Sequence, residues 1–168
     1  MRCLDNVNQS ITERRDIVIE TAFKLFAENR IEPVTMTVVA NNCNMGVASI
    51  YRYFGTKKEL VIAVATKKWR EYYGELQRHY NELNVEKMTA AQELEFYIDR
   101  YIDLYKENSD LLNFNANFSI YIGSEDTTKD EMKPYNSIID KFVNKFHMLY
   151  KKAQDDKTVR TDISERSI

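Results

Sequence analysis

Apolar residues recur at helical spacing along most of the chain, and this pattern predicts an all-α fold. The first such stretch, residues 12–29, places its apolar side chains three and four positions apart, which gives a helix with one buried face. Thr12 is expected to cap the N-terminus of that helix. Only four glycines and two prolines occur in 168 residues, so turns are few and the helices are long.

Two short helices joined by a tight turn are expected next. Glu32-Pro33 ends the first helical pattern, because a residue before proline avoids the α region. Thr35 or Thr37 then caps a second, short helix. Asn44 is expected in the left-handed conformation, and Gly46 admits the chain to a third helix. This arrangement is typical of a helix-turn-helix, in which the second helix of the pair lies across the first.

The third helix, Val47–Tyr53, is expected to have one buried and one outward side. Ile50 and Phe54 are four positions apart, so both anchor the helix to the core. Five other side chains then lie toward or along the outside, where small, aromatic and cationic groups fit a major groove. They are Val47, Ala48, Ser49, Tyr51 and Arg52. On the preceding helix, three side chains are expected to point inward, namely Val38, Val39 and Cys43.

Capping patterns of the Ser/Thr-x-x-Glu/Gln type predict where later helices begin. They are Thr56–Glu59, Thr89–Gln92 and Thr128–Glu131. The first opens a long helix over about residues 57–83, and the helix opened by the last runs to Ala153. Ser109 or Asp110 caps a further helix between the other two. The buried stripe of the helix after Thr89 is expected to be Leu94, Ile98, Tyr101, Ile102 and Tyr105.

Composition is that of a soluble globular protein, with 43% hydrophobic and 30% charged residues, but the charge is unevenly distributed. The formal net charge is −2, whereas residues 46–70 hold six cations against Glu59 alone. These cations are Arg52, Lys57, Lys58, Lys67, Lys68 and Arg70. Such a basic cluster attracts phosphates. A solvated helix face is the alternative interpretation.

Several classes of protein are disfavoured by what the sequence lacks. Cys3 and Cys43 lie far apart and form no disulfide framework, which indicates a reducing cytoplasm. No run approaches the roughly 18 apolar residues that span a bilayer. His79 and His147 have no cysteine or carboxylate at metal-ligand spacing, and no Gly-rich phosphate loop occurs. We therefore expect no enzyme activity, no metal, no other cofactor and no membrane partner.

A more specific pattern lies between residues 12 and 65. It consists of Val18-Ile19, Ala22, Leu25-Phe26-Ala27, Thr35, Val39-Ala40, Ile50-Tyr51-Arg52-Tyr53-Phe54 and Thr56-Lys57-Lys58-Glu59-Leu60. With these residues the chain resembles the tetracycline-repressor (TetR) family of bacterial transcription factors. The family usually has Ala-Gly-Val-Ser where this chain has Cys43-Asn44-Met45-Gly46. Asn in the turn costs little, and Gly in place of Ser weakens the helix cap by roughly a few tenths of a kcal/mol.

The resemblance implies a helix-turn-helix DNA-binding domain over residues 1–55 and a helical regulatory domain over residues 56–168. It implies a ligand-responsive regulator, most often a repressor, that reads a palindromic operator through the helix Val47–Tyr53. The implied DNA-binding residues are Met36, Thr37, Val47, Ala48, Ser49, Tyr51, Arg52, Tyr53 and Lys57. Arg52 suits a bidentate contact to guanine and Lys57 a phosphate. The alternative for Tyr51 and Tyr53 is a half-buried core aromatic, which explains Tyr53 equally well.

The resemblance also implies a small-molecule effector and a homodimer, because two recognition helices read a palindrome. An aromatic interior with several hydroxyls suits a partly apolar ligand. The candidate lining residues are Tyr97, Tyr101, Tyr105, Phe114, Phe118, Tyr121, Phe142 and Phe146. Residues in helical stripes are more often plain core, and this interpretation stays open for each of them.

The segment Val159–Ile163 resembles the part of the family that precedes its last two helices, which usually pair with a second subunit. Those two helices are expected to be absent here. Either the sequence is a truncated form or dimerisation is built differently.

An all-helical protein-interaction module without DNA binding is the alternative function. The basic cluster with Tyr51, Arg52, Tyr53 and Lys57 favours DNA. Binding to DNA would also depend strongly on salt, which separates the two hypotheses.

Overall fold

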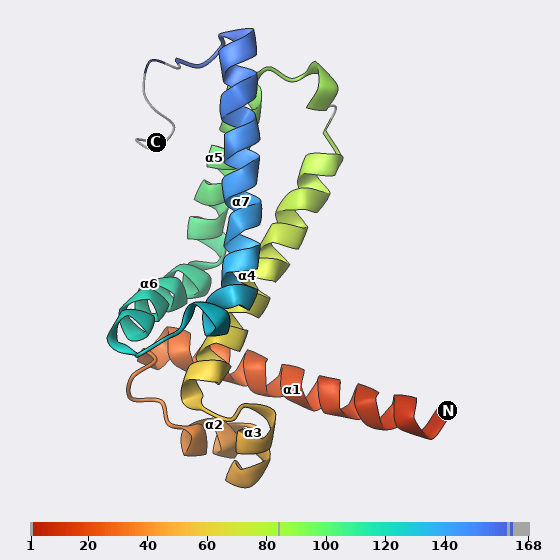
Figure 1. The fold of residues 1–168 in the computed structure, drawn as a ribbon, viewed down its shortest axis with the longest axis vertical. Helices are drawn as coiled ribbons and strands as arrows, with labels where there is room; N and C mark the ends of the chain where they lie inside the picture. The colour runs from red at the N-terminus through yellow and green to blue at the C-terminus, as the bar shows by residue number, and fades with distance from the viewer. Residues whose placement is uncertain (1, 84, 161, 163–168) are drawn as a thin grey trace. The chain divides into compact units, whose positions relative to one another are not determined.

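All regular structure in the computed structural model is helical (Figure 1), and the structure describes residues 2–83, 85–160 and 162. The helices within these residues are α1 Arg2–Asn29, α2 Met36–Asn42, α3 Val47–Tyr53, α4 Lys57–Asn81, the short 3-10 helix η1 Val85–Lys87, α5 Ala90–Glu107, α6 Ser109–Ser124 and α7 Lys129–Asp156. The predicted all-α class is confirmed. None of the described helices combines the length and the apolar character needed to cross a bilayer.

The chain divides into two compact units, each built from two separate segments. Unit 1 comprises Met1–Lys67 and Asp110–Pro134, and unit 2 comprises Lys68–Ser109 and Tyr135–Ile168, as far as their residues are described. Unit 1 therefore combines the three N-terminal helices with most of α6. The division at residue 55, which follows the order of the sequence, stays a prediction.

Helix α1 begins earlier than expected. It starts at Arg2, so Thr12 lies inside the helix and the prediction of a cap at Thr12 is wrong. The residues before Thr12 include neither proline nor glycine, and nothing in them stops a helix from extending towards the N-terminus. The C-terminal end at Asn29 agrees with the sequence pattern.

The caps and the turn around α2 and α3 follow local sequence chemistry. Of the two candidate caps of α2, Thr35 is the one used, and its hydroxyl accepts a hydrogen bond of 3.2 Å from the amide of Val38. Asn44 has a φ of 52°, as predicted for the turn residue. Gly46 precedes α3 in extended conformation and offers no side-chain cap. Helix α3 thus starts with a weak cap and depends on packing.

The caps predicted at Thr56, Thr89 and Thr128 are also confirmed. The cap predicted at Ser109 or Asp110 is wrong, because α6 begins at Ser109 and both residues lie inside the helix. Thr89 and Gln92 form a complete capping box at the start of α5, and Glu131 at the start of α7 accepts a 2.7 Å bond from the amide of Thr128. At the start of α4, Glu59 donates its amide to the Thr56 hydroxyl. The Glu59 carboxylate accepts a hydrogen bond from the amide of Gly55, whereas a capping box would use the amide of Thr56.

An aromatic cluster joins α6 to α1 inside unit 1. Phe114 is fully buried, and its ring centroid lies 5.6 Å from that of Phe23 and 6.3 Å from that of Phe26. Phe118 follows on the same helix, and its ring centroid lies 5.9 Å from that of Phe114. These contacts explain why a helix remote in sequence belongs to the N-terminal unit.

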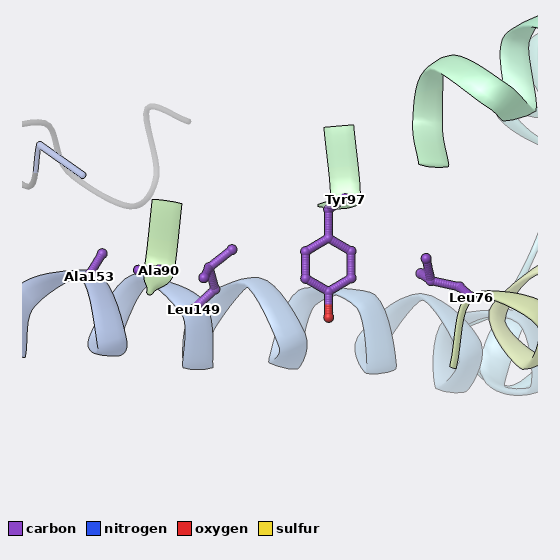
Figure 2. Close-up of a cluster of buried hydrophobic side chains, with 5 residues drawn as sticks. All are labelled: Leu76, Ala90, Tyr97, Leu149 and Ala153. Atoms are coloured by element: carbon purple, nitrogen blue, oxygen red, sulfur yellow. The ribbon is translucent and has the colours of Figure 1, made fainter. Parts of the chain in front are cut away.

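The core of unit 2 is formed by α4, α5 and α7. Figure 2 shows Leu76 from α4, Ala90 and Tyr97 from α5, and Leu149 and Ala153 from α7. The start of α5 is held to the end of α7, because Asp156 accepts a 2.6 Å hydrogen bond from the amide of Ala90. A second aromatic group in this unit surrounds Phe142, which contacts Trp69, Tyr72 and Tyr73.

The predicted buried stripe of α5 is wrong for four of its five residues. Ile98, Tyr101, Ile102 and Tyr105 are 41–70% exposed, and Leu94 alone packs against the core. The buried side is instead Ala90, Glu93, Tyr97 and Leu104. Both sets have helical spacing, so periodicity alone does not choose between them.

Two side chains predicted to point inward, those of Val38 in α2 and Cys43 directly after it, are not buried. Val38 is exposed and Cys43 is only partly buried, whereas Val39 is buried as expected. A helix of two turns has room for one buried row, and Met36, Val39 and Ala40 fill it. Of the C-terminal segment considered above, Thr161 and Ile163 lie outside the described residues.

We expect Phe114→Ala to lower the free energy of unfolding by about 3–5 kcal/mol, because it removes the ring that joins α6 to α1. Ile120→Ala, on the same helix but 74% exposed, is the matched control and should change stability by less than about 0.5 kcal/mol. Urea unfolding followed by circular dichroism measures both. Equal effects of the two substitutions would show that α6 is not packed as described.

Candidate functional site

Helix α3 is fixed on one side and open on the other. Ile50 and Phe54 are 0% and 1% exposed, as predicted for its two anchors. The Arg15 guanidinium of α1 lies 4.8 Å from the centre of the Phe54 ring and closes this side. Figure 1 shows α3 beside α2, and the turn between them is held by a 3.0 Å hydrogen bond from Met45 N to the Ala40 carbonyl. The rotation of α3 about its axis is therefore set by packing.

The residues predicted to contact DNA differ in their exposure. Thr37, Ala48, Tyr51 and Arg52 are exposed, and Val47, Ser49, Tyr53 and Lys57 are partly buried. Met36 is only 4% exposed, so its side chain belongs to the core and the prediction that it contacts DNA is corrected. As the first residue of α2, Met36 lies on the same face as Val39 and Ala40.

Arg52 is the cation best placed to meet a ligand on this surface. Its guanidinium lies 5.7 Å from the centre of the Tyr53 ring, so the ring supports it through a cation–π contact. Arg52 forms no ion pair with any described residue, and the planar fork remains available for a bidentate contact. Tyr53 is half-buried, which fits both roles considered for it.

Much of the basic cluster seen in the sequence is paired within the molecule. Lys67 forms ion pairs with Asp16 at 3.0 Å and Glu20 at 3.2 Å. Lys68 pairs with Glu71 at 3.0 Å. The count of charges between residues 46 and 70 therefore overstated the basic surface. The partners of Lys67 lie on α1, distant in sequence, and the partner of Lys68 lies just beyond that range.

Lys57 also has internal partners. Its ammonium donates a 2.8 Å hydrogen bond to the Glu32 carbonyl and lies 5.4 Å from the centre of the Tyr121 ring. Burial lowers the pKa of Lys57, against the opposing effect of Glu32 and Glu125. One of its three N–H groups donates to the Glu32 carbonyl, and two are left that can donate elsewhere. A contact between Lys57 and a DNA phosphate therefore stays a prediction.

Lys58 connects the start of α4 to the segment between α6 and α7. Its ammonium lies 2.7 Å from the Glu131 carboxylate and donates to the Asp126 carbonyl at 2.7 Å. The hydrogen bond from Lys58, followed by those from Thr128, lowers the pKa of Glu131 to about 2. We call Lys57, Lys58, Tyr121, Asp126 and Glu131 the junction. It ties the α6–α7 segment to the residues that directly follow α3.

A hollow of about 530 Å³ lies in unit 2 between side chains of α4, α5 and α7, and we call it the cavity. It is lined by Tyr73, Tyr80, Glu93, Tyr97, Lys141, Asn144, Lys145, Met148, Leu149 and Lys152. Its volume falls in the range of small-molecule sites. A second hollow, of about 240 Å³ beside Tyr72 and Arg100, is smaller than most such sites.

Only Tyr97 of the eight predicted ligand residues lines the cavity. Phe114, Phe118 and Tyr121 are buried in unit 1, and Tyr101 and Tyr105 are exposed on α5. Phe142 packs against Trp69, while Phe146 lies beside Tyr97 at 5.4 Å between ring centroids without lining the cavity. The sequence did contain one usable signal for the missed residues: Lys141 and Lys145 are four positions apart and so share a face of α7.

Glu93 organises the polar side of the cavity. It is 6% exposed, accepts a 2.8 Å hydrogen bond from the Tyr80 hydroxyl and forms an ion pair with Lys152. Burial and then the charge of Glu93 raise the pKa of Tyr97 to about 12. Burial and the same carboxylate raise the pKa of Tyr80. Both phenols therefore stay protonated near neutral pH, and the single O–H of Tyr80 is already donated to Glu93.

Comparison with known proteins finds a family match in the N-terminal part and a curated relative. Residues 18–64 match the family described as bacterial regulatory proteins, tetR family. An HTH-type transcriptional regulator of Staphylococcus aureus (strain bovine RF122 / ET3-1) is 26% identical over 91 residues, which cover 52% of this chain and 49% of the relative. The chain thus spans about half the length of the curated relative it matches.

Solved structures share the fold over most of the chain. The fatty acid degradation regulator FadR from Bacillus halodurans has a TM-score of 0.69 at 14% identity, with 92% of this chain and 75% of that chain covered. A putative transcriptional regulator from Saccharomonospora viridis, solved with choline, has a TM-score of 0.73 at 16% identity, with 90% and 75% covered. FadR from Bacillus subtilis, solved with stearoyl-CoA, has a TM-score of 0.68 at 17% identity, with 90% and 76% covered.

The junction predicts a pH-dependent contribution to stability. Because the pKa of Glu131 is lowered in the fold to about 2, its charge stabilises the folded state above the unfolded pKa of about 4.5, and this stabilisation is lost as the pH falls towards 2. The melting temperature of Glu131→Gln should therefore lie below that of the parent near pH 6, and the gap should narrow between pH 5 and pH 3.

Asp130→Asn is the control, because Asp130 pairs with Lys133 in an exposed position where an ion pair contributes little. Thermal unfolding at each pH gives the two differences. A gap for Glu131→Gln that stays constant with pH would contradict the role of the ion pair with Lys58.

Proposed function

We propose that the chain is a ligand-responsive, sequence-specific DNA-binding regulator of transcription, because residues 18–64 match the family described as bacterial regulatory proteins, tetR family. A repressor that acts in the cytoplasm is the simplest form of this proposal. It needs no catalytic group, metal or other cofactor. The match of residues 18–64 supports the DNA-binding part, and the similar folds support the overall architecture.

The observation that carries the proposal is the outward side of α3. Tyr51 and Arg52 are exposed on a helix whose opposite side is held down by Ile50 and Phe54. A major groove admits an α-helix, and the commonest specific base contact is a bidentate one from Arg or Lys to guanine. Val47 and Ala48 add small apolar groups that suit a thymine methyl.

We propose a homodimer on a palindromic operator. A helix of two turns reads few base pairs, so a single copy would bind weakly. Two copies related by a two-fold axis would place two α3 helices on half-sites about one helical turn apart. This part of the proposal rests on the DNA-binding geometry, and the surface that joins the two copies is left open.

We propose that the effector binds in the cavity of unit 2. The S. viridis regulator was solved with choline and the B. subtilis FadR with stearoyl-CoA, so similar folds hold small molecules. Helix α4 carries two lining residues, Tyr73 and Tyr80, and its first residues directly follow α3. An effector that favours one position of α4 would thus alter DNA affinity, provided that its own affinity differs between the two states.

The alternative is a helical protein-interaction module, and a salt series separates it from DNA binding. Affinity for DNA should fall steeply as salt rises, because bound counterions are released from the phosphates. Binding to a protein partner through α3 would lack the steep slope that comes from counterion release.

We expect Arg52→Ala to weaken binding to a selected operator by about 1–3 kcal/mol and to relax specificity at one base position, because a bidentate contact to guanine is lost. Fluorescence anisotropy with a labelled duplex measures the affinity. Arg78→Ala is the matched control, because Arg78 is an exposed arginine in the last turn of α4. If both variants bind like the parent, α3 is not the reading helix.

A further inference from the structure

We propose that the cavity of unit 2 is a site for an organic anion, in which a carboxylate, sulfonate or phosphate is joined to an aromatic or aliphatic body. The proposal deepens the proposed function, on which it rests for the biological role of the site, by naming the chemical class of the effector. It stands on charge, on the position of the lysines over aromatic rings, and on the apolar lining.

The charges that line the cavity are unequal. The lining contains three lysines (Lys141, Lys145 and Lys152) and one carboxylate, that of Glu93, so it carries two net positive charges. Glu93 is already engaged by Lys152 and by the Tyr80 hydroxyl. Lys141 and Lys145 form no ion pair with any residue that the structure describes. An anion would therefore supply the charge that the protein itself does not provide.

The aromatic faces are used in a way that disfavours a cationic ligand. The Lys145 ammonium lies 4.4 Å from the centre of the Tyr80 ring, and that of Lys141 lies 5.5 Å from the centre of the Tyr73 ring. These faces would otherwise attract a ligand cation. Here each holds a protein ammonium at the wall of the cavity, and the remaining N–H groups of these lysines can donate to an anion.

The rest of the lining suits the uncharged part of such a ligand. Leu149 and Tyr97 are buried at the cavity wall, and Met148 offers a flexible apolar side chain that adapts to ligand shape. Asn144 lies between Lys141 and Lys145 on α7 and adds an amide donor. The cavity therefore has a cationic part formed by α7 and an apolar part formed by α5 and α7.

Two dyes with nearly the same rings test this directly. 8-Anilinonaphthalene-1-sulfonate carries an anionic group, and N-phenyl-1-naphthylamine lacks it; both become fluorescent in apolar sites. We expect the intact chain to bind the sulfonate more tightly, and Lys145→Gln to weaken that binding by about tenfold because a charge-assisted contact is lost. Binding of the uncharged dye should be unchanged in Lys145→Gln.

Matched variants separate the charge from damage to the fold. Lys151→Gln removes an exposed lysine of the same helix that does not line the cavity, and it should bind both dyes like the parent. Lys145→Arg keeps the charge and should recover most of the affinity for the sulfonate. Equal affinity of the parent for both dyes, or equal losses in Lys145→Gln and Lys151→Gln, would overturn the assignment.

Operator binding measured on the same samples keeps the two proposals apart. If the sulfonate binds as expected while no duplex is bound, the anion site stands and the transcriptional role fails. If a duplex is bound with salt dependence while Lys145→Gln leaves sulfonate binding unchanged, the regulator stands and the anion site is overturned.

Discussion

The burial of Ile50 and Phe54 is the constraint on which the candidate interface depends. With both side chains in the core, α3 has one permitted rotation about its axis, and Tyr51 and Arg52 must face away from the unit. The helix has only a weak cap at Gly46, so it owes its position to these two contacts and to the turn at Asn44. A rigid support of this kind gives a reading helix a defined geometry before it meets a ligand.

The cations near α3 also fall into two groups, those that pair inside the unit and one that is exposed. Lys57, Lys58 and Lys67 bind partners inside unit 1, where they hold α1 and the α6–α7 segment to α4. Arg52 is exposed on the outward side of α3, and its guanidinium lies over the Tyr53 ring. In unit 2 Lys152 pairs with the buried carboxylate of Glu93, whereas Lys141 and Lys145 lie over tyrosine rings, and the lining of the cavity keeps an excess of positive charge. The positive charge of each candidate site, the outward side of α3 and the cavity, therefore comes from a few positioned cations and not from a continuous basic surface.

The features that the sequence predicted are those decided within a few residues. The left-handed turn at Asn44, the bounds of α3 and the box at Thr89 depend on local backbone chemistry. Most of the wrong predictions involve long-range packing: periodicity did not show that α5 turns Tyr97 inward, and no local signal joins Phe114 to α1. The cap expected at Thr12 is a local exception, because α1 continues towards the N-terminus through residues that do not stop a helix. The cavity is formed by side chains of three helices, and of the eight residues predicted to line a ligand site only Tyr97 lies at its wall. The ligand role of the other seven stays a prediction.

Selection of DNA sequences by the intact chain from a random duplex pool tests most directly whether α3 reads DNA. The expected result is enrichment of a motif with two inverted half-sites whose centres lie about 10–10.5 base pairs apart, with a guanine at a position that becomes variable in Arg52→Ala. Recovery of the pool without any enriched motif, at salt concentrations where the chain remains folded, would contradict the assignment of α3 as a DNA-reading helix.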